Sequence, residues 1–269
     1  MAVAACYVNF SITAWRLRRA HVRERLDHRA TERRQRCSTR RGWLVCLGFI
    51  IALGWVGPQL VWASDEAETE ALVTKARLAL ENFGHDPEMT SLRRLASKAR
   101  GIFIMPQLFK GAFIVGGSGG HGVLMAREGI DQPWRGPAFY TVGGISFGLQ
   151  IGAEFSEVVL LAMTSRGMTT MLSSSLKLGA DINIAVGPVG AGAGAATAGL
   201  SADLLVFSRS KGLYGGISLQ GAVMSTRDKL NQAFYGQAVS TTDILIRGTV
   251  FNDKANGLLT SVSQFPLAR

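Results

Sequence analysis

Few side chains in this chain are spaced for catalysis. Glu154 and Glu157 could form a carboxylate pair, but residues three apart on a strand point to opposite faces, so we expect Glu154 to form a structural hydrogen bond or ion pair instead. His85 and His121 stand apart from carboxylate clusters, and no H-E-x-x-H or C-x-x-C motif occurs. Serines are plentiful, but histidine is too scarce to favour a serine nucleophile. We therefore predict no catalytic residue, no bound metal and no enzymatic activity. An enzyme would need a pocket of converging polar groups, which the sequence does not display.

The glycine-rich stretch Gly117–Gly122 satisfies the G-x-G-x-x-G spacing of dinucleotide-binding proteins. That chemistry needs the glycines between a strand and the N-terminus of a helix, where the pyrophosphate meets the helix dipole. Here the next residues, 123–126, are typical of another strand. The sequence therefore predicts a glycine hairpin turn and no nucleotide or other cofactor.

A helix predicted over residues 86–99 could attract anions. Asp86 and Pro87 mark its start, and Met89, Leu92, Leu95, Ala96 and Ala99 form an apolar stripe. The cations beside this stripe are Arg93, Arg94, Lys98 and Arg100, with Lys110 further along the chain. A basic amphipathic helix of this kind can bind an acidic membrane surface. The alternative is a helix packed on a sheet with its charges in water.

The positive charge of the chain is concentrated in its first part. Residues 1–63 contain 11 Arg and 3 acids, a net of +8, whereas the remainder has 18 Lys plus Arg against 16 acids, a net of +2. The total of +10 therefore belongs mainly to the leader and is poor evidence for a nucleic-acid-binding domain. We predict no nucleic-acid partner.

Residues 1–63 are predicted to be a basic leader with a signal peptide or a membrane anchor. An apolar run over residues 42–57 follows Arg40 and Arg41, and Val61-Trp62-Ala63 resembles a cleavage site. We favour a signal cleaved near Ala63, which predicts an exported protein that is periplasmic or membrane-associated. Residues 1–41 have three interpretations: a basic arm, an extended start of the signal, or a stretch upstream of the start codon that is used.

Residues 64–269 are predicted to form a single α+β domain without any cysteine, since all three cysteines precede residue 64. Periodicity predicts a helix over 65–83, capped by Asp65, and strands that include one long alternating strand over 145–155. Further expected elements are strands at 102–105, 112–115, 122–126, 158–163 and 182–186, and helices at 168–178, 226–235 and within 241–263. We expect two N-terminal helices on a glycine-rich, strongly curved or barrel-like antiparallel sheet, with further helices covering its ends.

A strand, turn and second strand are predicted over residues 203–224. An apolar run at 204–207 precedes a polar turn over 208–212, and alternation resumes from Ile217. The turn places Arg209 and Lys211 beside Tyr214 at a hairpin tip, where they could reach an anionic surface.

This hairpin resembles the signature of the SYLF domain. The similarity covers residues 208–221, and three other stretches, 151–154, 187–190 and 231–236, follow in the family's pattern, so it extends over roughly residues 67–263. The resemblance implies binding to phosphoinositide-like membranes and, in some members, to actin. No actin-contacting motif maps onto this chain residue by residue, so actin stays an implication of the resemblance alone.

The sequence and the resemblance together predict a non-enzymatic exported protein that binds anionic phospholipid membranes. The predicted lipid-binding residues are Arg93, Arg94, Lys98, Arg100, Lys110, Arg209 and Lys211. The alternative is a structural or interaction module of the cell envelope whose partner is a protein.

Overall fold

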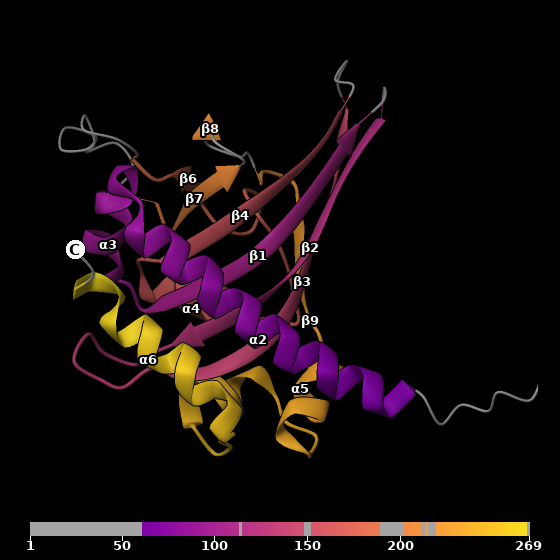
Figure 1. Ribbon diagram of the computed structural model, residues 1–269, viewed down its shortest axis with the longest axis vertical. Helices are drawn as coiled ribbons and strands as arrows, with labels where there is room; N and C mark the ends of the chain where they lie inside the picture. Colours follow the sequence, from indigo (N-terminus) through magenta and orange to yellow (C-terminus); the bar gives the residue numbers. More distant parts are fainter. Residues whose placement is uncertain are drawn as a thin grey trace, which may run out of the picture. The chain divides into compact units, whose positions relative to one another are not determined.

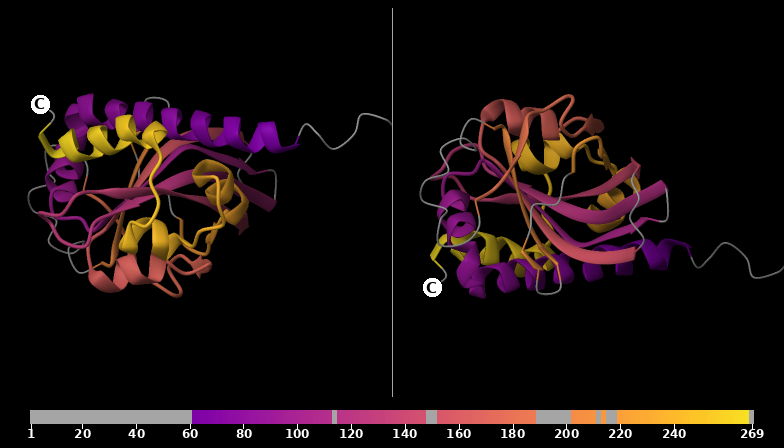
Figure 2. Two further views of the ribbon diagram at one scale, coloured as in Figure 1. Left: turned by 90° about the horizontal axis from the view of Figure 1, so that it is seen from below. Right: turned by 90° about the horizontal axis from the view of Figure 1, so that it is seen from above.

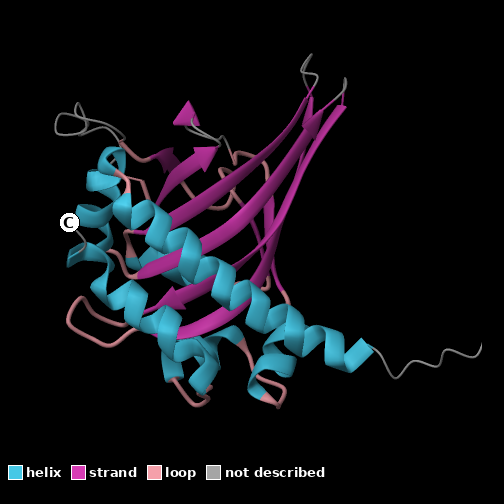
Figure 3. Cartoon of the chain, viewed as in Figure 1, coloured by secondary structure: helices cyan, strands magenta, loops and turns pink. Residues whose placement is uncertain are grey.

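The computed structural model describes residues 61–112, 115–147, 152–188, 202–210, 213–214 and 219–267, and Val61–Arg269 form one compact unit. A nine-stranded, strongly curved sheet lies at its centre, with helices packed on both faces (Figure 1; Figure 3). The α+β fold with a curved, mainly antiparallel sheet, predicted from the sequence, is confirmed.

Four long strands form the middle of the sheet. They are β1 (Gly101–Ala112), β2 (Val115–Ala126), β3 (Arg135–Phe147) and β4 (Gly152–Ala162). The shorter strands are β5 (Ser175–Lys177), β6 (Ile184–Val186), β7 (Leu204–Ser210), β8 (Leu213–Tyr214) and β9 (Val223–Thr226). The order across the sheet is β5-β9-β3-β2-β1-β4-β7-β6, with β8 paired to β7. Only β6 and β7 pair in parallel among the described strands.

The helices divide between the two faces of the sheet. On one face lie α2 (Val61–His85), α3 (Thr90–Ala96), α5 (Asp228–Tyr235) and α6 (Asn256–Gln264), with short 3-10 turns at Pro87–Met89, Asp253–Ala255 and Phe265–Leu267. On the other lie α4 (Ser165–Met171) and a π-helical segment, η6 (Asp243–Arg247). Figure 2 shows α2 and α6 side by side on one side of the strands and α4 on the opposite side. Within the described residues, no helix has the length and apolar content that crossing a bilayer requires.

Alternating side chains of the long strands fill two separate cores. Ile102 and Ile104 of β1 pack under α2, whereas Phe103 and Met105 face the core on the α4 side. This is the period of two expected for a strand buried on both faces. Because α2 crosses the sheet obliquely, the ends of β1 to β4 extend beyond it (Figure 1).

The glycine-rich stretch predicted to be a hairpin turn lies inside strand β2, so that prediction was wrong. The physical reason is a close approach between strands. A β-bulge interrupts β1 between Ile104 and Gln107, opposite Gly122. A Cβ at Gly122 would lie 2.4 Å from the Phe103 ring and 2.6 Å from the Ile104 carbonyl oxygen. The absent side chain is therefore required by packing and not by a turn.

The single strand predicted over residues 145–155 is also wrong. Ile145 lies near the end of β3 and Phe155 near the start of β4, and the two strands are separated in the sheet by β2 and β1. The predicted strands at 102–105 and 122–126 are parts of the longer β1 and β2. The strand predicted over 112–115 is wrong, because Ala112 ends β1 and Val115 begins β2, with residues 113 and 114 outside the described part of the chain. Alternation continued through these boundaries, so it concealed where each strand begins and ends.

The predicted hairpin over residues 203–224 is confirmed only in its first half. The apolar run forms the buried strand β7, and β8 pairs with it antiparallel. The second strand was predicted from Ile217, which lies outside the described residues. Leu219 to Ala222 form a turn in which Gly221 has a φ of +81°, and β9 begins at Val223.

The residues predicted to begin or end helices were correct at some boundaries and wrong at others. Asp86 caps the 3-10 turn before α3 by accepting a hydrogen bond from the Glu88 N–H, and Gly236 ends α5 with a φ of +71°, as predicted. Asp65 does not cap α2, which begins at Val61, and Arg227 rather than Thr226 precedes α5. The helix predicted over 168–178 ends at Met171, and β5 follows.

Arg127, immediately after β2, holds the end of α3 against the sheet. Its buried guanidinium donates to the carbonyl oxygens of Ala96 (3.3 Å), Ser97 (2.6 Å), Ala99 (2.8 Å) and Ile130 (2.6 Å). It also lies 4.5 Å from the centroid of the Trp134 ring. These bonds satisfy carbonyl groups that the end of a helix otherwise leaves without a partner.

We expect Gly122→Ala and Gly143→Ala to have opposite effects on stability. The first inserts a methyl group into the Phe103 ring and should lower the free energy of unfolding by about 1–3 kcal/mol. At Gly143 the nearest atom to a Cβ is the Ser118 carbonyl oxygen at 3.9 Å. Alanine there should therefore raise the free energy of unfolding by roughly 0.5–1 kcal/mol. Urea denaturation of both variants measures this. Equal destabilisation by the two changes would contradict the conclusion that packing requires glycine at residue 122 but not at residue 143.

Arg127→Met should destabilise the protein because it removes four hydrogen bonds to carbonyl groups of Ala96, Ser97, Ala99 and Ile130. We expect the free energy of unfolding to fall by about 3 kcal/mol, the range for hydrogen bonds made by charged groups. Arg166→Met, at an exposed position on α4, is the matched control, with an expected change within about 0.5 kcal/mol. The interpretation fails if chemical denaturation gives the same value for both.

Candidate functional site

The helix predicted over residues 86–99 ends earlier, at Ala96, so Lys98 and Arg100 lie beyond α3. Its predicted cations do not all face solvent in the same way. Arg94 and Lys98 are exposed. Arg93 is partly buried and donates to the carbonyl oxygens of Gly84 (2.8 Å) and Asp86 (2.9 Å), which join α2 to α3. Arg100 donates to the Glu128 carbonyl oxygen (3.0 Å). Arg94 on α3 and Lys98, two residues beyond the end of α3, are therefore the cations of this group that are most accessible to a ligand.

The apolar stripe of α3 is committed to the core. Met89, Leu92, Leu95, Ala96 and Ala99 are all buried. The helix consequently packs on the sheet with its charges at the surface, which was the alternative interpretation of its sequence. An apolar side chain that inserts into a membrane would have to come from another part of the molecule.

The other predicted cations lie away from α3. Lys110 is ten residues beyond Arg100, near the far end of β1, at a distance of roughly 30 Å for an extended strand. Arg209 on β7 is paired with Asp86 (3.7 Å) and Glu157 (3.6 Å). Lys211 lies outside the described residues. The seven predicted residues therefore do not form one continuous patch.

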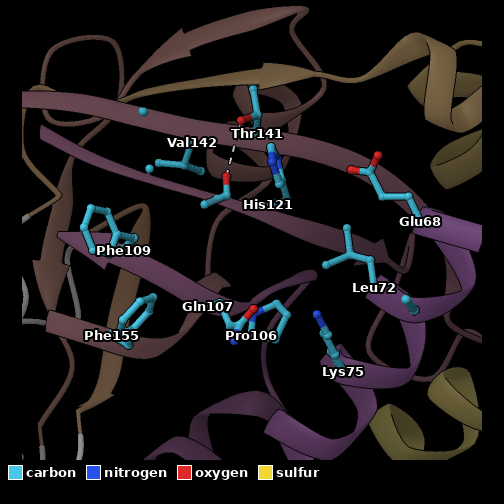
Figure 4. Close-up of a pocket in the computed structure, with 14 residues that line it drawn as sticks. Glu68, Leu72, Lys75, Pro106, Gln107, Phe109, His121, Thr141, Val142 and Phe155 are labelled. Atoms are coloured by element: carbon cyan, nitrogen blue, oxygen red, sulfur yellow. Dashed lines mark hydrogen bonds between the residues drawn. The ribbon is translucent and has the colours of Figure 1, made fainter. Parts of the chain in front are cut away.

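A cleft of about 510 Å³ lies between α2 and the exposed part of the sheet. One wall is formed by Ala71, Leu72 and Lys75 of α2, and Figure 4 shows Lys75 and Glu68 across from His121. The aromatic rings of Phe109 and Phe155 lie at the other end, with their centroids 5.2 Å apart. A smaller cleft of about 290 Å³ adjoins it beside Phe155 and contains Asn82, Glu157 and Arg209.

The polar residues of the cleft form a mixed cluster. Arg227 pairs with Glu68 at 2.5 Å, and the Thr141 hydroxyl donates to the Gly120 carbonyl oxygen at 3.3 Å. Burial and then the charge of Arg227 lower the pKa of His121, and Glu68 acts in the opposite direction. The imidazole is therefore neutral at pH 7. Among the described residues Lys75 makes no ion pair, which leaves the cluster with one uncompensated positive charge.

The carboxylates considered for catalysis lie on opposite faces of β4, as predicted. Glu154 accepts a hydrogen bond from the Ser156 hydroxyl (3.3 Å), whereas Glu157 accepts one from the Asn82 amide (3.1 Å) and pairs with Arg209. The described residues contain no cluster of three or more side chains that could hold a metal. The cleft itself was not predicted, because its walls come from segments far apart in sequence.

Part of the chain matches a known family. Residues 143–265 match the Ysc84 family model, described as "Las17-binding protein actin regulator". The matched region runs from the middle of β3 to the residue after α6, and it includes the cleft residues Gly143 and Phe155.

Curated relatives are similar over a longer stretch. Human SH3 domain-containing YSC84-like protein 1 is 30% identical over 181 residues, which cover 66% of this chain and 52% of that protein. Protein YSC84 of Saccharomyces cerevisiae is 31% identical over 153 residues, covering 55% of this chain and 32% of the relative. SH3 domain-containing protein PJ696.02 of Schizosaccharomyces pombe is 33% identical over 154 residues, covering 55% and 35%. The chain spans about half, or less, of the length of these relatives. Residues 143–265 of this chain belong to the Ysc84, or SYLF, domain family.

Proposed function

We propose that this protein is a non-enzymatic module that binds anionic phospholipid surfaces. The observation that carries the proposal is the pair Arg94, on α3, and Lys98, just beyond its end, which are both exposed while the apolar residues of that helix are buried. A cation near an anionic membrane contributes about 1 kcal/mol. Arg100 and Lys110, both partly exposed, are secondary contacts in this proposal.

The binding should depend on this patch more than on the charge of the whole domain. Residues 64–269 have a net charge of only +2, from 18 cations and 16 acids. Such a small net charge gives weak long-range attraction, which salt screens over about 10 Å at 0.1 M ionic strength. We also propose that the protein is exported and acts at a membrane surface of the cell envelope, as the apolar run over residues 42–57 suggests.

A protein partner is the second candidate function. It is supported by the description of the matched family as a Las17-binding actin regulator, and by the SH3 domains in the names of similar proteins. For this chain we propose that the partner would be a protein of the cell envelope. The two candidates differ in whether purified lipid alone is bound.

Co-sedimentation of the full chain with vesicles tests the lipid proposal. We expect binding to phosphatidylcholine vesicles that contain phosphatidylglycerol, and weaker binding as salt increases. Arg94→Glu/Lys98→Glu should reduce the binding constant by roughly tenfold or more, since about 1 kcal/mol per cation is lost. Arg93 is left unchanged because its hydrogen bonds join α2 to α3.

The matched control is Arg166→Glu/Lys229→Glu, which makes the same change in charge at exposed positions on α4 and α5. All these variants keep the same leader, so a contribution from its apolar run cancels in the comparison. Equal loss by both double variants would show that only net charge matters. Unchanged binding of the α3 variant would contradict the proposed site, and no binding by any folded sample would favour the protein partner.

A further inference from the structure

A row of residues crosses five strands on the uncovered part of the α2 face. The strand register aligns Phe155 of β4, Phe109 of β1, Gly119 of β2, Gly143 of β3 and Val223 of β9. The two aromatic rings are 52% and 44% exposed, and Val223 is 39% exposed. Two bare glycines thus lie between large apolar side chains and form the floor of a trough. Its floor and the two phenylalanines line the cleft, and Val223 continues the row beyond the cleft residues.

The glycines of this floor are not required by packing. A Cβ at Gly119 would have the Val142 carbonyl oxygen as its nearest neighbour at 3.8 Å, and one at Gly143 would meet the Ser118 carbonyl oxygen at 3.9 Å. On the opposite face of β2, a Cβ at Gly120 would lie 2.4 Å from the Gln107 carbonyl oxygen. Glycine inside a strand costs stability. Glycine at these two positions therefore lowers stability but leaves the space above the strands open.

The trough has a polar end and an apolar end. Thr141 and His121 lie two residues before Gly143 and two after Gly119 on antiparallel strands, next to Lys75 and the Glu68–Arg227 pair. In the other direction Ile145, with 75% of its surface exposed, lies near the end of β3. The uncompensated charge of Lys75 suits an anionic group at the polar end, and the apolar side chains suit a hydrocarbon chain along the floor.

The width of the trough favours a narrow ligand. Phe109 and Val223 are three strands apart, about 14 Å between backbones. Their side chains narrow this gap further, so an α-helix of 10–12 Å diameter does not fit on the floor. The cleft volume of about 510 Å³ lies within the range of small-molecule sites.

We propose that the trough binds one acyl chain of an anionic membrane phospholipid, whose headgroup lies at Lys75. The inference rests on the proposed function and adds a second contact to it, because α3 has no apolar side chain to insert. Charge on α3 would bring the protein to the membrane surface, and the trough would hold a single lipid from the leaflet.

Photo-cross-linking with the full chain tests this contact. The probe is a vesicle of phosphatidylcholine and phosphatidylglycerol in which the phosphatidylglycerol carries a diazirine in its acyl chain. We expect cross-links in residues 107–109, 119–121 and 139–145. Gly119→Val/Gly143→Val should fill the floor and reduce the cross-link yield roughly tenfold, equivalent to about 1.4 kcal/mol. The fraction of protein that sediments with the vesicles should fall much less.

Gly129→Val is the control, because it makes the same chemical change in a loop outside the cleft, where a Cβ makes only an ordinary contact at 3.4 Å. Thermal unfolding verifies that the variants are folded. If the double glycine variant does not fold, Phe109→Ser/Phe155→Ser replaces exposed side chains of the same trough and should give the same loss. Cross-links confined to α3, or an unchanged yield in the filled variants, would overturn the proposal.

Calorimetry with monomeric lysophosphatidylglycerol, below its micelle concentration, separates this proposal from the previous one. Binding that is lost in the filled variants supports the trough even if no vesicle is bound, in which case only the proposed surface function fails. No heat of binding together with no trough cross-links would overturn the trough. Light scattering that shows a dimer in the original chain and a monomer in the filled variants would also overturn it, in favour of a second copy.

Discussion

The close approach of β1 to β2 at the bulge is the constraint on which the rest of this structure depends. The bulge adds a residue to β1 opposite Gly122, and bulges increase the local twist of a strand pair. Only a glycine leaves room there for the Phe103 ring and the Ile104 carbonyl oxygen. The twist turns the far ends of the long strands away from α2, which spans the sheet obliquely. The uncovered sheet face beside α2 is a consequence of this geometry.

The same glycine-rich stretch serves two purposes because alternate residues of a strand face opposite sides. Gly120 and Gly122 permit tight packing toward the α4 side, whereas Gly119 faces the open trough and is not constrained by a neighbour. A stability requirement and a binding requirement can therefore occupy one stretch of sequence. In this account α3 supplies charge at the surface and the trough supplies apolar contact, so attraction and insertion are separate properties of the fold.

Features that depend on neighbouring residues were predictable from the sequence, and features that depend on tertiary contacts were not. Asp86 and Gly236 act within one turn of their own helices, so their roles could be identified. The alternation from Ile145 to Phe155 has no break where the chain leaves one strand for another, so strand periodicity alone could not find the boundary. Likewise, no local signal shows that Arg93 donates to carbonyl groups, or that segments from α2 and four strands enclose a cleft.

The most direct test of this account is to map the lipid contact on the backbone. Amide resonances of the isotopically labelled full chain would be followed by NMR during titration with monomeric lysophosphatidylglycerol. The account predicts that Gly119 and Gly143 shift in a saturable manner, together with the exposed Phe109 and Phe155, while Gly122 on the opposite face does not. Shifts confined to α3, or shifts spread equally over both faces of the sheet, would contradict it.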